Sequence, residues 1–152
     1  MKNVFYYNTP IGIISIIDDG ECIIKIDFGK TEFEDMNINE TELIMRTYKQ
    51  LKEYFDGIRK EFDIPIKMEG TYFQKKVWNA LKRIPYGETR SYKDIAVMVG
   101  NEKASRAVGM ANNKNPIPII VPCHRVIGAD GKMVGYGGGL DIKVKLLDIE
   151  KI

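Results

Sequence analysis

The chain has 152 residues, of which 44% are hydrophobic and 29% are charged, an ordinary balance for a globular protein. This length allows one or two small domains, and no apolar run approaches the roughly 20 residues of a membrane-spanning helix, so we expect no membrane association. The formal net charge of +2 is unevenly spread, because residues 1–69 hold 9 Lys/Arg and 14 Asp/Glu, whereas residues 70–152 hold 14 and 7. A basic second part suggests a polyanionic partner such as nucleic acid, although a solvated basic surface would show the same charge.

The cysteine and histidine content limits the chemistry further. Cys22 and Cys123 are the two cysteines, too few for a disulfide framework, and the N-terminus does not have the features of a signal peptide. We therefore expect a cytoplasmic protein. One histidine and two distant cysteines cannot complete a four-ligand zinc site without carboxylates, so we expect no bound metal.

The acidic part is predicted to be a small α/β domain over residues 1–66. Residues 3–28 contain three apolar runs separated by turn signals, which predicts a meander of three antiparallel strands. Residues 30–39 are polar and are expected to form a loop. Residues 40–57 carry apolar side chains at helical spacing and end at a glycine, and residues 61–67 could return to the sheet as a short strand.

The basic part, residues 67–152, is predicted to be mostly helical. Residues 71–84 place apolar side chains at helical spacing, and Ser91 can cap a further helix over 92–99. A second short helix follows over 103–115 after a turn that contains glycine, which is the pattern of a helix-turn-helix. This second helix is rich in small residues, and Arg106 is the one large polar side chain within that run.

The stretch NPIPIIVPCHRVIG, residues 115–128, holds the strongest chemical signal. An apolar run that could be a buried strand leads directly into Cys123 and His124, the only histidine of the chain. An imidazole can accept the proton of a thiol and so activate it as a nucleophile. Neighbouring side chains on an extended strand point to opposite faces, so a turn at Pro122-Cys123 or a bridging water is needed. A buried cysteine beside a structural histidine is the alternative.

The remaining residues comprise a glycine-rich loop and a helix. Residues 128–139 contain several glycines and one aromatic residue, Tyr136, as expected for a loop that passes close to another group. The chain then ends in a helix over 141–151.

Three segments together resemble the O6-alkylguanine-DNA alkyltransferases, also called methylated-DNA–protein-cysteine methyltransferases. They are PYGETRSYKDIA, ASRAVGMANNKNPIPIIVPCHRVIG and GYGGGLDIKVKLLDIE, and with their spacings they cover roughly residues 71–150. The resemblance implies an α+β protein, with an N-terminal ribonuclease-H-like sheet-and-helix domain followed by a mostly helical, winged helix-turn-helix-like domain.

The resemblance also implies a mechanism and a set of catalytic residues. Cys123 would accept a methyl or small alkyl group from O6 of guanine, or from O4 of thymine, and would keep it as a thioether. His124 would take the thiol proton through a water, and Glu150 would orient His124. Asn115 would brace the turn before Cys123, and Tyr92 would donate a proton to the departing guanine.

The family flips the damaged base out of the duplex, so the implied partner is double-stranded DNA that contains O6-alkylguanine. The second helix would lie in the minor groove, and Arg106 would fill the gap left by the flipped nucleotide. The other residues expected to contact DNA are Ser91, Ala104, Ala107, Gly109 and Arg125. The residues expected to line the base pocket are Tyr136, Gly137, Val134 and Pro118.

Each molecule would act once, as a monomer, because a thioether has no easy leaving group. The methyl donor is the DNA itself, so no cofactor is expected. Gly137 stands where mammalian members carry a serine, and Val134 replaces a smaller residue, and both differences bear on how bulky an alkyl group the pocket accepts. The sequence leaves open the preference between guanine and thymine lesions.

Two other functions fit part of the pattern. A DNA-binding regulator without transfer activity would explain the basic half and Arg106, but not the Cys-His pair or Glu150. A cysteine hydrolase would turn over repeatedly on an ester or amide.

Overall fold

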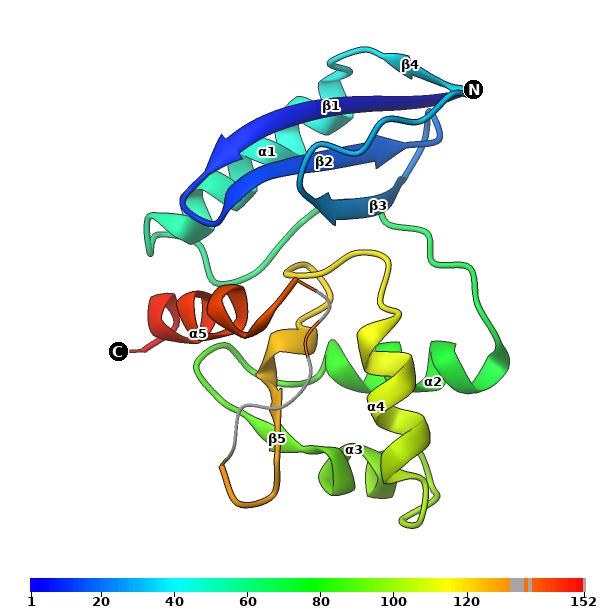
Figure 1. Ribbon diagram of the computed structural model, residues 1–152, viewed down its shortest axis with the longest axis vertical. Coiled ribbons are helices and arrows are strands. Elements are labelled where there is room, and N and C mark those ends of the chain that lie inside the picture. The colour runs from blue at the N-terminus through cyan, green and yellow to red at the C-terminus, as the bar shows by residue number, and fades with distance from the viewer. Residues whose placement is uncertain (132–135, 137, 152) are drawn as a thin grey trace. The chain divides into compact units, whose positions relative to one another are not determined.

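The computed structural model describes residues 1–131, 136 and 138–151. The backbone contacts divide the chain into two compact units, Met1–Met68 and Glu69–Ile152, which are described in turn. The first unit is a sheet covered by a helix, and the second is mostly helical (Figure 1). The predicted α+β class is therefore confirmed. No helix among the described residues is long and apolar enough to cross a membrane.

The sheet of the first unit has four strands in the order β3-β2-β1-β4. Strands β1 (Lys2–Thr9), β2 (Gly12–Asp18) and β3 (Ile23–Phe28) pair antiparallel, which confirms the predicted meander. Strand β4 (Met36–Ile38) pairs parallel with β1, so the prediction of a loop is wrong at these three residues. Three residues that pair with a distant strand are too few to show a periodic pattern.

Helix α1 (Glu42–Phe55) lies across one face of this sheet (Figure 1). The Thr41 hydroxyl accepts a hydrogen bond from Ile44 N (3.1 Å) and so satisfies one of the free N–H groups at the start of the helix. The same hydroxyl donates to Asp18 Oδ2 (2.5 Å), which ties the start of the helix to the end of β2. The buried side of α1 includes Leu51 and Tyr54, and both are fully inaccessible to solvent.

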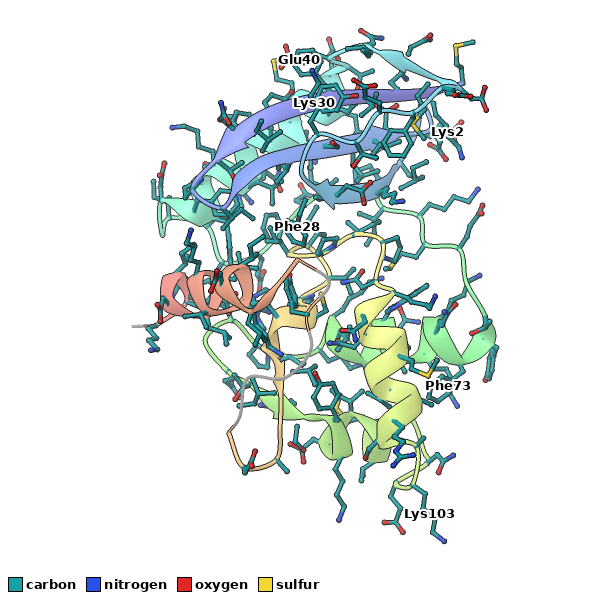
Figure 2. The ribbon with its side chains drawn as sticks, in the orientation of Figure 1. Lys2, Phe28, Lys30, Glu40, Phe73 and Lys103 are labelled. Atoms are coloured by element: carbon teal, nitrogen blue, oxygen red, sulfur yellow. The ribbon has the colours of Figure 1, made fainter. Side chains whose placement is uncertain are left out.

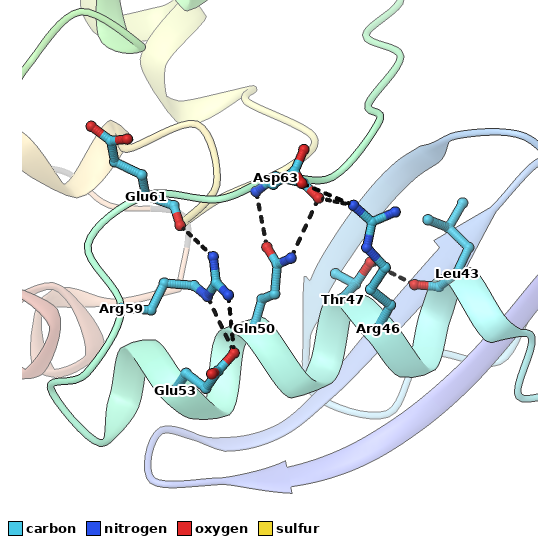
Figure 3. A network of polar contacts seen from close by, with 8 residues as sticks. All are labelled: Leu43, Arg46, Thr47, Gln50, Glu53, Arg59, Glu61 and Asp63. Carbon is cyan, nitrogen blue, oxygen red and sulfur yellow. Dashed lines mark hydrogen bonds and ion pairs between the residues drawn. The ribbon is translucent and has the colours of Figure 1, made fainter.

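Polar contacts hold the segment after α1 against the helix (Figure 3). The Gln50 side chain accepts from Asp63 N (2.9 Å) and donates to Asp63 O (3.4 Å). The segment joins the sheet through a single bridge between Ile23 and Ile66. The strand predicted over 61–67 is therefore reduced to one bridge.

The second unit contains α2 (Tyr72–Leu81), α3 (Tyr92–Met98) and α4 (Ser105–Asn113), which pack against one another. Ser91 caps α3, as predicted, and forms a capping box with Asp94: the Ser91 hydroxyl accepts from Asp94 N (3.0 Å), and the Asp94 carboxylate accepts from Ser91 N (2.9 Å). These helices agree with the helix-turn-helix pattern.

The apolar run before Cys123 is a turn and not the expected strand. Pro118 and Val121 form an isolated bridge, and Ile119 between them has a positive φ of 73°. A positive φ is uncommon for a β-branched residue, and it reverses the chain where a strand would continue. The expectation of a buried strand is therefore wrong, although the run is buried.

Two further elements complete the second unit. Strand β5 (Arg90–Ser91) pairs parallel with β6 (Val126–Ile127). Helix α5 (Leu140–Ile149) runs to Glu150 and packs against the segment that contains Cys123. Cys123 and Glu150, which are far apart in the sequence, thus belong to neighbouring elements.

Candidate active site

A tight turn presents Cys123. Pro122 has φ −81° and ψ 66°, the geometry of an inverse γ-turn, and Cys123 N donates to Val121 O across it (2.8 Å). A single turn of 3₁₀ helix, η1 (Cys123–Arg125), follows at once. The turn expected at Pro122-Cys123 is therefore present, and His124 follows within the same helical turn.

Glu150 binds the imidazole of His124. The two side chains are buried, and His124 Nε2 lies 2.5 Å from Glu150 Oε2. Glu150 Oε1 also accepts from the backbone N–H of Gly87 (3.1 Å). Gly87 has a φ of +81°, and a methyl group at this position would lie 3.4 Å from the Glu150 carbonyl. The imidazole of His124 and the backbone N–H of Gly87 thus fix the position of the Glu150 carboxylate.

Arg125 is the second ionic partner of Glu150, and its position differs from our expectation. We expected a DNA contact, but the side chain is 8% exposed and its guanidinium donates to both carboxylate oxygens of Glu150 (2.8 and 3.2 Å). Its third donor binds Ile84 O (2.7 Å), and the ring of Tyr86 lies below it. Arg125 therefore compensates the buried charge of Glu150 and is not a surface residue.

Cys123 is 4% exposed as a residue, and burial is the main influence on the acidity of its thiol. Burial raises the pKa of the thiol, because a thiolate is poorly solvated there. The neighbouring side chains of Asn115 and Tyr136 lower this pKa again, as does the charge of Lys143. These three residues therefore favour the thiolate form against the cost of burial.

Lys143 of α5 is a buried cation that the sequence analysis did not identify. Its side chain is inaccessible, and Nζ donates to Val126 O (2.6 Å), just after η1. Burial lowers the pKa of Lys143, and the negative charge of Cys123 opposes this shift. Among the buried charges of Arg125, Lys143 and Glu150, one cation is in excess, and a thiolate at Cys123 would balance it.

Burial also lowers the pKa of His124, although the Glu150 carboxylate raises it in part. The imidazole is therefore neutral at neutral pH and can accept a proton.

Asn115 and Tyr92 both lie close to Cys123. Asn115 Nδ2 donates to Val121 O (2.7 Å) and Oδ1 accepts from Ile117 N (3.0 Å), so this residue braces the turn before Cys123. Tyr92 is half-buried, and burial together with the nearby Cys123 raises the pKa of its phenol. The phenol therefore keeps its proton until another group takes it.

Helix α4 presents an exposed face that contains Arg106, Ala107 and Met110. Gly109 borders the Tyr92 ring, since a methyl group there would lie 3.7 Å from Tyr92 Cε1. Lys103 projects from the turn before α4 (Figure 2). Ala104 and Ser91, two more of the expected DNA contacts, are partly exposed.

The expected pocket residues are only partly described. Pro118 is buried in the turn before Cys123, and Tyr136 is partly buried and interacts with the Cys123 thiol. Val134 and Gly137 lie outside the described residues. Within the described part of the chain, no group of three His, Cys, Asp or Glu side chains could hold a metal ion.

Sequence reasoning missed several residues that support the site. Gly87 and Tyr86 belong to the segment PYGETRSYKDIA, in which the sequence analysis gave neither residue a role, yet both contact the end of α5. Asn112 also lies at the site, because its Nδ2 donates to Cys123 O (3.3 Å). Their only sequence signal is their position within the segments that resemble the alkyltransferases.

The fold and the site together define a class of protein: a helix-turn-helix unit with a buried cysteine beside a His–Glu pair. The family model for the DNA-binding domain of 6-O-methylguanine DNA methyltransferase matches residues 72–152. The model for the ribonuclease-like domain of the same family matches residues 4–68. The chain therefore belongs to the 6-O-methylguanine DNA methyltransferase family, and the predicted resemblance is confirmed.

Curated relatives and solved structures agree with this assignment. The chain is 54% identical to a methylated-DNA–protein-cysteine methyltransferase of Methanosarcina acetivorans, over 95% of each chain. It is 46% identical to the constitutive enzyme of the same name from Bacillus subtilis, over 97% of this chain and 96% of the relative. The structure of Mycobacterium tuberculosis OGT in complex with DNA matches with a TM-score of 0.92 and 44% identity, over 98% of this chain and 92% of the other.

Proposed function

We propose that this chain repairs alkylated DNA by direct reversal, as a methylated-DNA–protein-cysteine S-methyltransferase. It transfers a methyl or small alkyl group from O6 of guanine, and also from O4 of thymine, to Cys123. The observation that carries the proposal is a buried cysteine, Cys123, that is followed directly by a buried His124–Glu150 pair at 2.5 Å, within the DNA-binding domain of this family.

The transfer is a displacement at the alkyl carbon. The Cys123 thiolate attacks this carbon, a sulfur–carbon bond forms, and the carbon–O6 bond breaks with its electrons going to guanine. The thiol proton passes to His124 through a water, and Tyr92 donates a proton to the departing guanine, which leaves as a neutral base. In sum, one proton moves from the thiol to guanine, and Tyr92 regains its own proton from His124.

The product explains why each molecule acts once. A thioether offers water no good leaving group, so Cys123 remains alkylated. The alkyl donor is the DNA, and the transfer needs no other donor. We further propose that the protein acts in the cytoplasm as a monomer.

The DNA surface is assigned to α4. A base within a duplex cannot reach a buried thiol, so the damaged nucleotide must flip out, at a cost of a few kcal/mol. Arg106 is exposed on α4, and it fills the gap in the stack. Ala104, Ala107 and Gly109 let the helix approach the minor groove closely, and Ser91 lies at the neighbouring start of α3.

We also assign four residues to the pocket that binds the flipped base: Tyr136, Pro118, Val134 and Gly137. Tyr136 has a second task, because its interaction with the thiol favours the thiolate.

Incubation with a duplex that carries labelled O6-methylguanine tests the proposal. Label should move to the wild-type protein in a burst of one equivalent, and none should move to Cys123→Ala. Binding without transfer would support a DNA-binding regulator, and repeated turnover on an ester or amide would support a hydrolase. Intact-mass measurement and peptide mapping would locate the adduct.

The role of Arg106 is tested separately with two substrates. Arg106→Ala should slow repair of the duplex lesion far more than transfer from a free benzylguanine, because only the duplex has a stack to fill. Equal losses on both substrates would exclude the intercalating role.

A further inference from the structure

A buried oxygen atom beside Cys123 has no hydrogen-bond partner among the described residues. Asn112 lies on α4 and is 1% exposed. Its Nδ2 donates to Cys123 O (3.3 Å), whereas its Oδ1 is buried and has no partner within the described part of the chain. Leaving a buried acceptor unsatisfied costs about 1–3 kcal/mol, and native proteins contain few such groups. A partner that arrives with the substrate would remove this cost.

The orientation of the amide is determined by its own hydrogen bond. If the side chain were rotated by half a turn, Oδ1 would face the Cys123 carbonyl, and two acceptors would oppose each other. The nitrogen therefore stays on Cys123 O, and the oxygen stays beside the backbone of the residue that carries the nucleophile. Asn112 thus offers a fixed acceptor beside the backbone of Cys123, and during transfer the base must come within bonding distance of the thiol of this same residue.

The two lesions differ in what they present to such an acceptor. O6-alkylguanine has lost its N1 proton, but it keeps the 2-amino group, a donor on the same edge as O6. O4-alkylthymine has lost its N3 proton and carries a carbonyl oxygen at position 2, so this edge presents acceptors only. Only the guanine lesion can satisfy Asn112 Oδ1.

Building on the proposed function, we infer that Asn112 is a specificity residue that accepts a hydrogen bond from the 2-amino group of O6-alkylguanine and so favours guanine over thymine lesions. A site with a buried acceptor rejects a substrate that lacks the matching donor, because the acceptor then stays unpaired. The expected discrimination is about 10- to 100-fold in rate, as for one unsatisfied buried acceptor.

Single-turnover rates on O6-methylguanine and O6-methylhypoxanthine in the same duplex test the inference, since these bases differ only by the 2-amino group. The wild type should repair the guanine lesion about 10- to 100-fold faster. Asn112→Leu, of similar size but without an acceptor, should bring this ratio close to one. O4-methylthymine should be a slow substrate for the wild type, and Asn112→Leu should narrow that gap.

Asn113→Leu is the matched control, because Asn113 is the next residue on α4 and is exposed. It should keep the wild-type ratio. A ratio of two rate constants from one preparation does not depend on how much of the variant is folded. Equal wild-type rates on the two purines, or an unchanged ratio in Asn112→Leu, would overturn the inference. If the wild type transfers from neither purine, the proposed function itself fails.

Discussion

Replacing Glu150 with glutamine should uncouple the buried ionic cluster and show how much it contributes. Glu150 accepts from His124 at 2.5 Å, from Arg125 at 2.8 and 3.2 Å, and from Gly87 N at 3.1 Å. In Glu150→Gln the guanidinium of Arg125, 6% exposed as a residue, keeps its charge and loses its counter-ion. Breaking a buried pair in this way costs about 3–5 kcal/mol, a large part of the free energy of unfolding of a small domain.

Thermal unfolding and single-turnover transfer measure the two consequences. A loss of this size should lower Tm by more than about 10 °C for a unit of this length. Transfer should slow by about 100-fold or more, because His124 loses the group that orients it and raises its pKa.

Glu53→Gln is the control for Glu150→Gln. Glu53 also binds an arginine, Arg59, at 3.2 Å, but the two side chains are 35% and 29% exposed. Such a pair contributes about 0–1 kcal/mol, so the unfolding temperature should hardly change.

The double variant Arg125→Met/Glu150→Gln separates stability from chemistry. Removing the uncompensated cation should recover much of the lost stability, whereas transfer should stay slow because His124 still lacks its carboxylate. Equal Tm values for Glu150→Gln and Glu53→Gln, or wild-type transfer by Glu150→Gln, would refute the reasoning.

Three further results are expected. Lys143→Met should raise the pKa of the acceptor thiol, so a pH titration of iodoacetamide alkylation should shift to higher pH; an unshifted curve would mean that Lys143 does not stabilise the thiolate. Gly87→Ala and Gly100→Ala should each cost about 1–2 kcal/mol in chemical denaturation, because both positions have positive φ, but only Gly87→Ala should also slow transfer, since only Gly87 binds Glu150. The pKa of His124 is lower in the folded state than in the unfolded chain, so the unfolded chain binds more protons below about pH 6.5. The free energy of unfolding should therefore fall as the pH drops through that value. In His124→Gln this part of the pH dependence should disappear.

Local pattern was enough for the helices and for the first hairpins. The apolar spacing of α1 and the helix cap at Ser91 depend on residues within a few positions of each other, and both appear in the structure as predicted. The motif around Cys123 also predicted a nucleophile and its histidine, and the proposed function depends on both. A turn at Pro122-Cys123 was one of two alternatives that the sequence left open, the other being a bridging water, because neighbouring side chains on a strand point to opposite faces. The structure has an inverse γ-turn there.

Tertiary structure alone decided the environment of the site. Strand β4 is three residues long and pairs with a strand far away in the sequence, so nothing local reveals it. Arg125 and Lys143 look like surface cations in the sequence, because a charged side chain is usually solvated. Both are buried, since Glu150 and the Val126 carbonyl reach them from elements that are distant in the chain. The sequence by itself thus predicted which residues carry the chemistry, whereas the burial and charge that set their pKa values arise only when these elements pack together.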